Sequence, residues 1–447
     1  MSKVETSPRV RTTTILRGSL ISIGVRLIDV PSRYGFHLLV AAELGVVATG
    51  RFYIVFSAMI ALAGFGRLGI DRALTRQIAI DLAQGRHAAV RPAIARALLL
   101  VLAASAIVSL VMVAGASPFA RYVMDKPALV TPLMLGALTI IPQNLGTVLA
   151  GALAGVQRIG FSQMIYSWLW PAIFCIVTAA TGLTVNGALL LIAASFVATG
   201  LLGALLLRRF LSAVPRDGER PAQPPRFLRL GLSLFTLELT QLLITSAPAI
   251  VLGIVSTALQ TGLFALAWRI TLIINLLMSG VAGMAAPKFA ELHARDDRRA
   301  LGLASAQAAG LVLCLSIPMV VVILAVPQYL LSLFGNGYAA GATTLRILAV
   351  GQLIGACFTA APELLGMTDY AIVLRWINTF SLAVLFLSLA ILTPLAASAG
   401  TAVATSLAII VNGAAAAWMT YRLLGIFSLA ILGRALADWL RPGKKTS

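Results

Sequence analysis

Residues 16–45 read LRGSLISIGVRLIDVPSRYGFHLLVAAELG, an apolar run long enough to cross a bilayer, with charged residues set into it. Arg26, Asp29 and Arg33 are spaced i, i+3 and i+7, so on a helix they share one face. Charged side chains at membrane depth are costly and normally face a bundle interior or a water-filled cavity. We therefore predict a first transmembrane helix that lines a cavity, with a kink at Pro31.

The composition is that of a polytopic membrane protein. Of the 447 residues, 60% are hydrophobic and 11% are charged, and the mean hydropathy is +0.96. Apolar runs of about 20 residues, the length of a transmembrane helix, recur along the chain. We predict an all-α fold with about twelve transmembrane helices, near residues 18–43, 50–69, 97–116, 129–153, 162–181, 186–207, 231–254, 261–285, 302–325, 342–365, 371–393 and 397–420.

The net charge of +19 follows membrane orientation and does not indicate a nucleic-acid surface. With the N-terminus inside, the basic residues outside the helices gather on the inner side. They lie before the first helix, in 67–96, at Arg158, in 208–229 and 288–299, and in the C-terminal tail. The outer side holds only Arg51, Arg121 and Lys126. This asymmetry predicts that both termini are cytoplasmic.

Internal similarity divides the chain into two six-helix lobes. Thr49-Gly50-Arg51-Phe52 and Thr261-Gly262-Leu263-Phe264 each open a predicted helix, 212 residues apart. Because six is even, the copies have the same orientation, which predicts a pseudo-two-fold axis along the membrane normal. The predicted parts are an N-terminal lobe (1–212), a proline-rich cytoplasmic linker (213–229), a C-terminal lobe (230–424) and a basic cytoplasmic tail (425–447).

No pattern in the sequence indicates catalysis. A phosphate-binding glycine-rich loop is absent, and the three histidines and three cysteines show no metal-ligand spacing. We expect no enzymatic activity, no cofactor and no metal.

Polar residues inside the predicted helices form the candidate site. Guanidinium groups bind phosphate or pyrophosphate through paired hydrogen bonds, and buried carboxylic acids bind a proton or sodium ion. The candidates for a cationic substrate-binding cavity are Arg26, Arg33, Arg51, Arg269 and Arg375; those for ion coupling or ion pairs are Asp29, Glu238 and Glu363; those for further polar lining are Gln241, Thr245 and Asn275.

Structural roles for the same charges are the alternative. The charges of the first helix would then form an ion-pair cluster that fixes helix packing, and Glu238 would pair with Arg269 on the next helix. Arg51 would anchor at the membrane interface, and Glu363 and Arg375, near helix ends, would extend to the interface.

Several motifs are shared with one family of transporters. They are the charged first helix, Leu44-Gly45, the two threonine–glycine motifs, LGIDRALTR at 68–76 and Ala286-Pro287-Lys288-Phe289. With these, nearly the whole chain resembles the Wzx-like oligosaccharide flippases of the multidrug/oligosaccharidyl-lipid/polysaccharide (MOP) exporter superfamily.

The resemblance implies two lobes around a central cavity in the bacterial cytoplasmic (inner) membrane. The expected function is translocation of undecaprenyl-diphosphate-linked oligosaccharide to the outer leaflet by alternating access, for O-antigen, exopolysaccharide or capsule synthesis. Expected partners are this lipid-linked substrate, membrane lipids, a coupling proton or sodium ion, and the polymerase and assembly proteins. The alternatives are an ion-coupled multidrug or metabolite antiporter of the same superfamily, and a membrane scaffold in a polysaccharide assembly complex.

Overall fold

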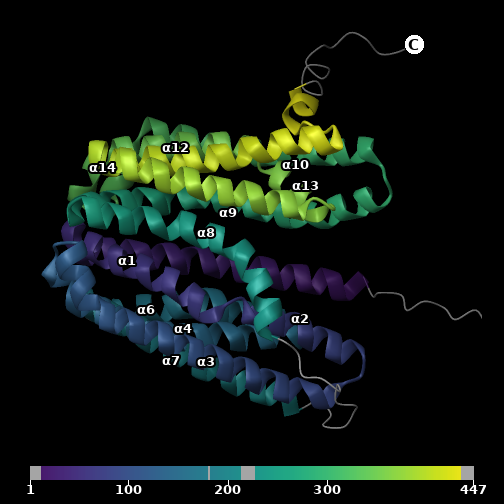
Figure 1. Cartoon of the computed structure of the whole chain (residues 1–447), viewed down its shortest axis with the longest axis horizontal. Coiled ribbons are helices and arrows are strands. Elements are labelled where there is room, and N and C mark those ends of the chain that lie inside the picture. The colour runs from purple at the N-terminus through teal and green to yellow at the C-terminus, as the bar shows by residue number, and fades with distance from the viewer. Residues whose placement is uncertain (1–11, 180–181, 213–226, 434–447) are drawn as a thin grey trace, which may run out of the picture. The chain divides into compact units, whose positions relative to one another are not determined.

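The computed structural model describes the backbone of residues 12–179, 182–212 and 227–433, and the side chains in these ranges from Ile28 onward except at 233, 234, 236, 237 and 336. Nearly all of these residues are helical and none forms a strand, which confirms the predicted all-helical class (Figure 1). The elements are α1 (Thr12–Arg67), α2 (Ile70–Ala83), α3 (His87–Pro118), η1 (Phe119–Val123), η2 (Pro127–Leu129), α4 (Val130–Gly155), α5 (Ile159–Gln163), η3 (Met164–Trp168), α6 (Leu169–Thr178), α7 (Val185–Ser212), α8 (Phe227–Val255), α9 (Ala258–Ala294), α10 (Arg298–Ala325), α11 (Pro327–Ser332), η4 (Asn336–Gly341), α12 (Ala342–Cys357), α13 (Ala360–Met367) and α14 (Ala371–Leu424).

Ten helical segments in the described ranges are long and apolar enough to cross a membrane. Two of them, 40 residues of α1 and the 54 residues of α14, are at least twice the length of about 20 residues that one crossing needs. Each contains a break, at Gly45 (φ 71°, ψ 170°) in α1 and at Ala396 and Ala397 in α14. Both breaks fall at gaps between predicted helices, 43–50 and 393–397. The count of twelve crossings and the orientation stay predictions.

One predicted helix, 342–365, is wrong, because α12 and α13 are separate helices with a turn between them. Pro362 lacks an amide hydrogen, so it cannot donate the usual i→i−4 hydrogen bond to the carbonyl oxygen of Phe358. That oxygen instead accepts from the amide of Ala361, at 3.0 Å. The proline thus explains why the helix ends and restarts here.

The chain forms two compact units, each assembled from separate stretches of sequence. The first is Met1–Glu43, Leu62–Ser117 and Val130–Thr236, and the second is Leu44–Ala61, Pro118–Leu129 and Leu237–Ser447. Most of the predicted linker 213–229 lies outside the described residues, as does the end of the predicted tail 425–447. The lobe boundaries stay predictions.

In the first unit, α2 packs against α4 at a close approach that glycines make possible. A Cβ atom at Gly151 would lie 2.8 Å from the carbonyl oxygen of Asp71, and one at Gly155 would lie 2.8 Å from Cβ of Ile78. The hydroxyl of Thr75 donates across this contact to the carbonyl oxygen of Gly151, at 2.9 Å. Small residues therefore let these helices pack backbone to backbone, as is common in membrane bundles.

A buried ion pair holds the turn after α2. Asp81, whose side chain is 1% exposed, accepts from Nη2 of Arg86 at 2.8 Å and from Nε2 of Gln77 at 3.0 Å. Removing the arginine leaves the buried carboxylate without its countercharge, which is costly. Because Arg86 is itself 27% exposed, we expect Arg86→Met to destabilise by about 1–3 kcal/mol, measured as a lower Tm in detergent.

The matched control for this ion pair is Arg298→Met. Nε of Arg298 lies 3.7 Å from Oδ1 of Asp296, and both side chains are well exposed. This ion pair therefore contributes little to stability. Equal Tm values for Arg86→Met and Arg298→Met would contradict the assignment.

In the second unit, the two repeated threonine–glycine motifs pack against each other. A Cβ atom at Gly50 would lie 1.7 Å from the carbonyl oxygen of Ala258 and 2.9 Å from the amide nitrogen of Gly262. One at Gly262 would lie 2.3 Å from the carbonyl oxygen of Val46. The crossing of the 44–61 segment with the start of α9 is therefore closed to any side chain.

Polar contacts secure the same end of the second unit. The hydroxyl of Tyr338 donates to Oγ1 of the fully buried Thr49, at 2.9 Å. Nζ of Lys126 donates to the carbonyl oxygens of Gly253 and Ser256, each at 2.8 Å, and so satisfies carbonyls at the C-terminal end of α8. Burial lowers the pKa of Lys126 from its usual value.

Candidate functional site

A polar cavity of about 480 Å³ lies within the second unit. Its walls come from α8, α9, α12, α13 and α14, and from the turn between α12 and α13. In Figure 1 these helices are the teal to yellow elements, with α12 beside α14. The volume is within the range of about 300–1,000 Å³ that is usual for small-molecule sites.

Four of the predicted site residues meet in this cavity. Gln241 and Thr245 come from α8, Asn275 from α9 and Glu363 from α13. The i and i+4 spacing of Gln241 and Thr245 places both on one helix face, and the threonine hydroxyl donates to the carbonyl oxygen of Gln241, at 2.8 Å. Residues more than 120 positions apart in the sequence are thus brought to one polar site.

Several lining residues are not predicted from the sequence. Gln352 on α12 and Trp268 on α9 are 1% and 4% exposed. The two side-chain amide atoms of Gln352 and the indole nitrogen of Trp268 have no hydrogen-bond partner among the described residues. The available signal was a glutamine inside an apolar helix, since a polar side chain at membrane depth is a functional candidate by default.

Asn412 on α14 is held in place from behind the cavity. Its Nδ2 donates to Oδ1 of Asn378 at 3.0 Å and to Oγ of Ser381 at 3.1 Å. An asparagine amide has two donor hydrogens and one acceptor oxygen. With both donors used, the lining residue Asn412 presents its carbonyl oxygen as an acceptor.

The described lining of this cavity is not cationic, whereas the sequence predicts a cationic substrate-binding cavity. None of the described residues that line it is lysine, arginine or histidine, and Glu363 is its one charged residue. Its polar lining otherwise consists of amides and hydroxyls. Such a surface binds uncharged groups through hydrogen bonds and has no cation to pair with phosphate.

Arg269 follows Trp268 on α9 but does not line the cavity. Its guanidinium carbon lies 5.6 Å from the ring centroids of both Tyr53 and Phe56, a distance at which rings attract a cation. Consecutive residues of a helix point about 100° apart, which explains the different surroundings. The predicted pairing of Arg269 with Glu238 stays a prediction.

In the first unit, two charges of the predicted first helix form an ion pair. Nε of Arg33 donates to Oδ1 of Asp29 at 2.7 Å, and its Nη2 donates to Oγ of Ser167 at 3.0 Å. The Ser167 hydroxyl in turn donates to the same oxygen of Asp29. The Arg33 side chain is 45% exposed, and its Nη1 makes no hydrogen bond within the described residues. The guanidinium is thus oriented by two partners and still accessible.

The remaining predicted arginines are placed as follows. Arg26 lies on α1, but its side chain is outside those described. Arg51 and Arg375 are exposed, on α1 and α14. Their roles in substrate binding, like that of Arg33, stay predictions.

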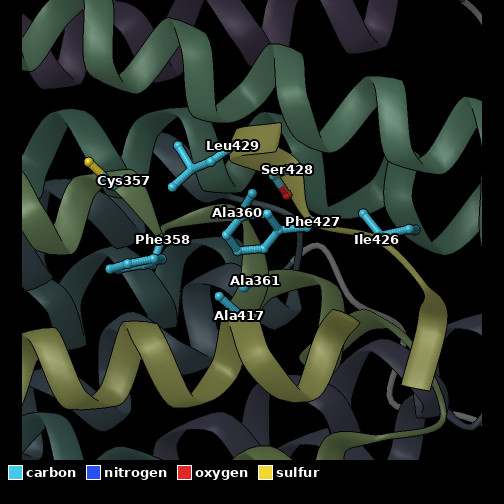
Figure 2. Close-up of a pocket in the computed structure, with 9 residues that line it drawn as sticks. All are labelled: Cys357, Phe358, Ala360, Ala361, Ala417, Ile426, Phe427, Ser428 and Leu429. Carbon is cyan, nitrogen blue, oxygen red and sulfur yellow. The ribbon is translucent and has the colours of Figure 1, made fainter. Parts of the chain in front are cut away.

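A second, much smaller hollow lies under the segment that follows α14 (Figure 2). Its volume of about 10 Å³ is room for about one water molecule. Residues 426–429 cover the face of α13 that carries Ala360 and Ala361, and Phe358 lines both this hollow and the large cavity. We interpret the hollow as a packing feature of the chain after α14, because Ile426 is buried in an apolar cluster there.

The similar solved structures agree on the fold. No curated protein matches the chain. Among solved structures, an inward-facing multidrug resistance MATE family transporter of the MOP superfamily is 15% identical, with a TM-score of 0.74 over 91% of this chain and 98% of its own. The lipid II flippase MurJ in an inward closed conformation is 14% identical, with a TM-score of 0.65 over 96% and 94%. A MOP superfamily transporter from Pyrococcus furiosus is 17% identical, with a TM-score of 0.63 over 92% and 95%.

The sequence also matches a family profile over more than half of its length. The matching residues are 15–293, and the family is described as polysaccharide biosynthesis protein. The fold of the chain is therefore that of solved MOP-superfamily transporters, as the resemblance predicts. The chain is a polytopic membrane protein with the MOP-superfamily fold, and it belongs to the polysaccharide biosynthesis protein family.

Proposed function

We propose that this protein is a flippase that moves undecaprenyl-diphosphate-linked oligosaccharide from the cytoplasmic to the outer leaflet by alternating access. The observation that carries the proposal is the match to a polysaccharide biosynthesis family in a chain whose described helices are long and apolar enough to span a membrane. Sugar units that are made in the cytoplasm and needed at the surface have to cross the apolar bilayer, and a polytopic membrane protein of this family is suited to that step.

The polar cavity supports transport as the activity. A hydrophilic head group crosses a bilayer only where protein or water replaces its hydration. A cavity of about 480 Å³ lined by amides and hydroxyls inside a helical bundle supplies such an environment. We propose that the protein is not an enzyme. We also propose that Arg33, held by its ion pair with Asp29 in the first unit, binds the anionic diphosphate.

The setting of this activity follows from the same proposal. The protein would lie in the bacterial inner membrane with both termini inside, as twelve helices in two lobes (1–212 and 230–424) joined by the linker 213–229. A proton or sodium gradient would drive the cycle, and the polymerase and assembly proteins would receive the product.

The chemistry of the cavity favours one second candidate, an ion-coupled multidrug or metabolite antiporter. A site for a cationic or amphipathic solute should present acidic and aromatic groups. Glu363, Trp268 and Phe358 line the cavity and no basic residue among those described does. The two candidates therefore predict different cargo for the same cavity.

A leaflet assay separates them. Cells that lack the protein should accumulate diphosphate-linked oligosaccharide on the cytoplasmic side and lose surface polysaccharide, and complementation should restore both. An unchanged leaflet distribution, together with reduced efflux of a cationic dye, would refute the flippase and establish the antiporter.

A further inference from the structure

Gln352 is buried in a way that folding alone does not explain. It is 1% exposed, and neither its amide oxygen nor its amide nitrogen has a hydrogen-bond partner among the described residues. A buried amide without partners costs free energy, which is recovered when a partner is supplied. Gln352 lines the large cavity, but its two amide atoms have almost no exposed surface. A bound molecule would therefore supply these partners once the side chain turns toward the cavity.

The neighbouring polar groups indicate which hydrogen-bonding groups that molecule should carry. The Ser279 hydroxyl donates to the carbonyl oxygen of Asn275 at 2.9 Å, and the Thr359 hydroxyl donates to that of Ala356 at 3.0 Å. These hydroxyl hydrogens are used, so the oxygens face a ligand as acceptors. The Asn412 oxygen and the Glu363 carboxylate are acceptors as well. A complementary ligand therefore carries several hydroxyl or amide donors.

The described lining of the cavity also includes aromatic residues and no basic residue. Trp268 lines the cavity although it is only 4% exposed, and its buried indole nitrogen lacks a partner among the described residues. Indole combines an apolar face with one donor, which suits a sugar ring with its C–H face and its oxygens. No described lining residue is basic, so a phosphate here would face the Glu363 carboxylate without a countercharge.

We propose that this cavity is a subsite for an uncharged sugar unit with hydroxyl and acetamido groups, and that Gln352 is the residue that selects for it. An acetamido group presents one N–H and one C=O, the complement of the two unpartnered atoms of the glutamine amide. The diphosphate of the substrate then binds elsewhere. This inference rests on the proposed flippase function and assigns the part of the substrate that the second unit binds.

Binding to the purified full-length protein in nanodiscs tests the assignment. The probes are N,N′-diacetylchitobiose, which is neutral, chitobiose, which is cationic, and N-acetylglucosamine 1-phosphate, which is anionic. Saturation-transfer NMR should detect the neutral disaccharide, with weaker signals for the other two. Gln352→Leu should weaken binding of the neutral probe by about tenfold or more, which corresponds to about 1.4 kcal/mol.

A stability measurement excludes a merely structural role for Gln352. Since leucine removes an unpartnered buried amide, Gln352→Leu should keep or raise the Tm while it weakens binding. The matched control is Gln143→Leu on α4. The buried amide oxygen of Gln143 also lacks a partner among the described residues, but Gln143 does not line the cavity. This control should leave binding unchanged.

Three results would overturn the assignment. Equal binding of N,N′-diacetylchitobiose by Gln352→Leu and the parent would remove Gln352 as the selecting residue, and normal export in the leaflet assay would leave the flippase function standing. Preferred binding of chitobiose, lost in Glu363→Gln, would make the cavity a cation site and favour the antiporter. A lower Tm of Gln352→Leu with unchanged affinity would assign the glutamine to packing.

Discussion

Gly262→Ala is expected to lower the yield of folded protein sharply. The new Cβ atom would lie 2.3 Å from the carbonyl oxygen of Val46 and 3.2 Å from the amide nitrogen of Gly50. Both are backbone atoms, so neither can rotate away as the end of a side chain would. Overpacking costs about 1–3 kcal/mol where side chains can adjust, and we expect a loss at or above the upper end of this range. Fluorescence-detected size exclusion and the Tm in detergent measure it.

The control for this prediction lies on the same helix. Nothing is within 4 Å of a Cβ atom at Gly283, so Gly283→Ala adds the same methyl group without a clash. Alanine also favours the helical backbone over glycine by about 1 kcal/mol, and the Tm of this variant should stay the same or rise. A similar fall in Tm for Gly262→Ala and Gly283→Ala would mean that the close crossing does not exist in solution.

Arg33→Ala is expected to abolish surface polysaccharide export while the protein still inserts into the membrane. Arg33 is oriented by Asp29 and Ser167 and is 45% exposed, as a group that meets an anionic ligand should be. Charge-assisted hydrogen bonds contribute about 1.5–3 kcal/mol each, which corresponds to a loss of roughly ten- to more than a hundredfold. Arg33→Lys should restore export only in part, because an ammonium cannot form the paired contacts of a guanidinium.

A double variant distinguishes phosphate binding from a structural ion pair. If the pair only fixes helix packing, Asp29→Ala with Arg33→Ala removes both charges together and should recover export relative to Arg33→Ala. If Arg33 contacts the diphosphate, the double variant inserts normally and stays inactive. Arg346→Ala, at an exposed arginine on α12, is the control and should export normally. Full export by Arg33→Ala would exclude the residue from the mechanism.

The helix breaks show how far local sequence predicts this fold. The gap before the second predicted helix contains Gly45, and its backbone has a positive φ that glycine adopts readily. Pro31 predicted a kink as well, but the non-helical dihedral angles of α1 occur at Gly45. Pro362 lies within the single helix predicted for 342–365, although its missing amide hydrogen ends α12. Glycine and proline change the conformation of their own backbone. Whether the helix then bends or breaks at that residue also depends on how it packs against neighbouring helices.

The candidate site shows where prediction from the sequence stops. Gln241, Thr245, Asn275 and Glu363 were predicted as polar lining, because polar groups in apolar helices avoid lipid. Gln352 is not among the predicted lining residues, although it too is a polar residue in an apolar helix. Which polar groups find a partner and which stay unpartnered depends on contacts between helices, and a single sequence does not contain these distances.

The sequence by itself determined that this is a helical membrane protein, because hydropathy is a local property of each stretch of the chain. The tertiary structure alone decided that the repeated glycines Gly50 and Gly262 pack against each other. It also decided that Arg269 lies beside Tyr53 and Phe56, while the adjacent Trp268 lines the cavity. Hydropathy states that a helix is buried in the membrane, but its rotation is set by packing against neighbouring helices, and that rotation determines which side chains form the site.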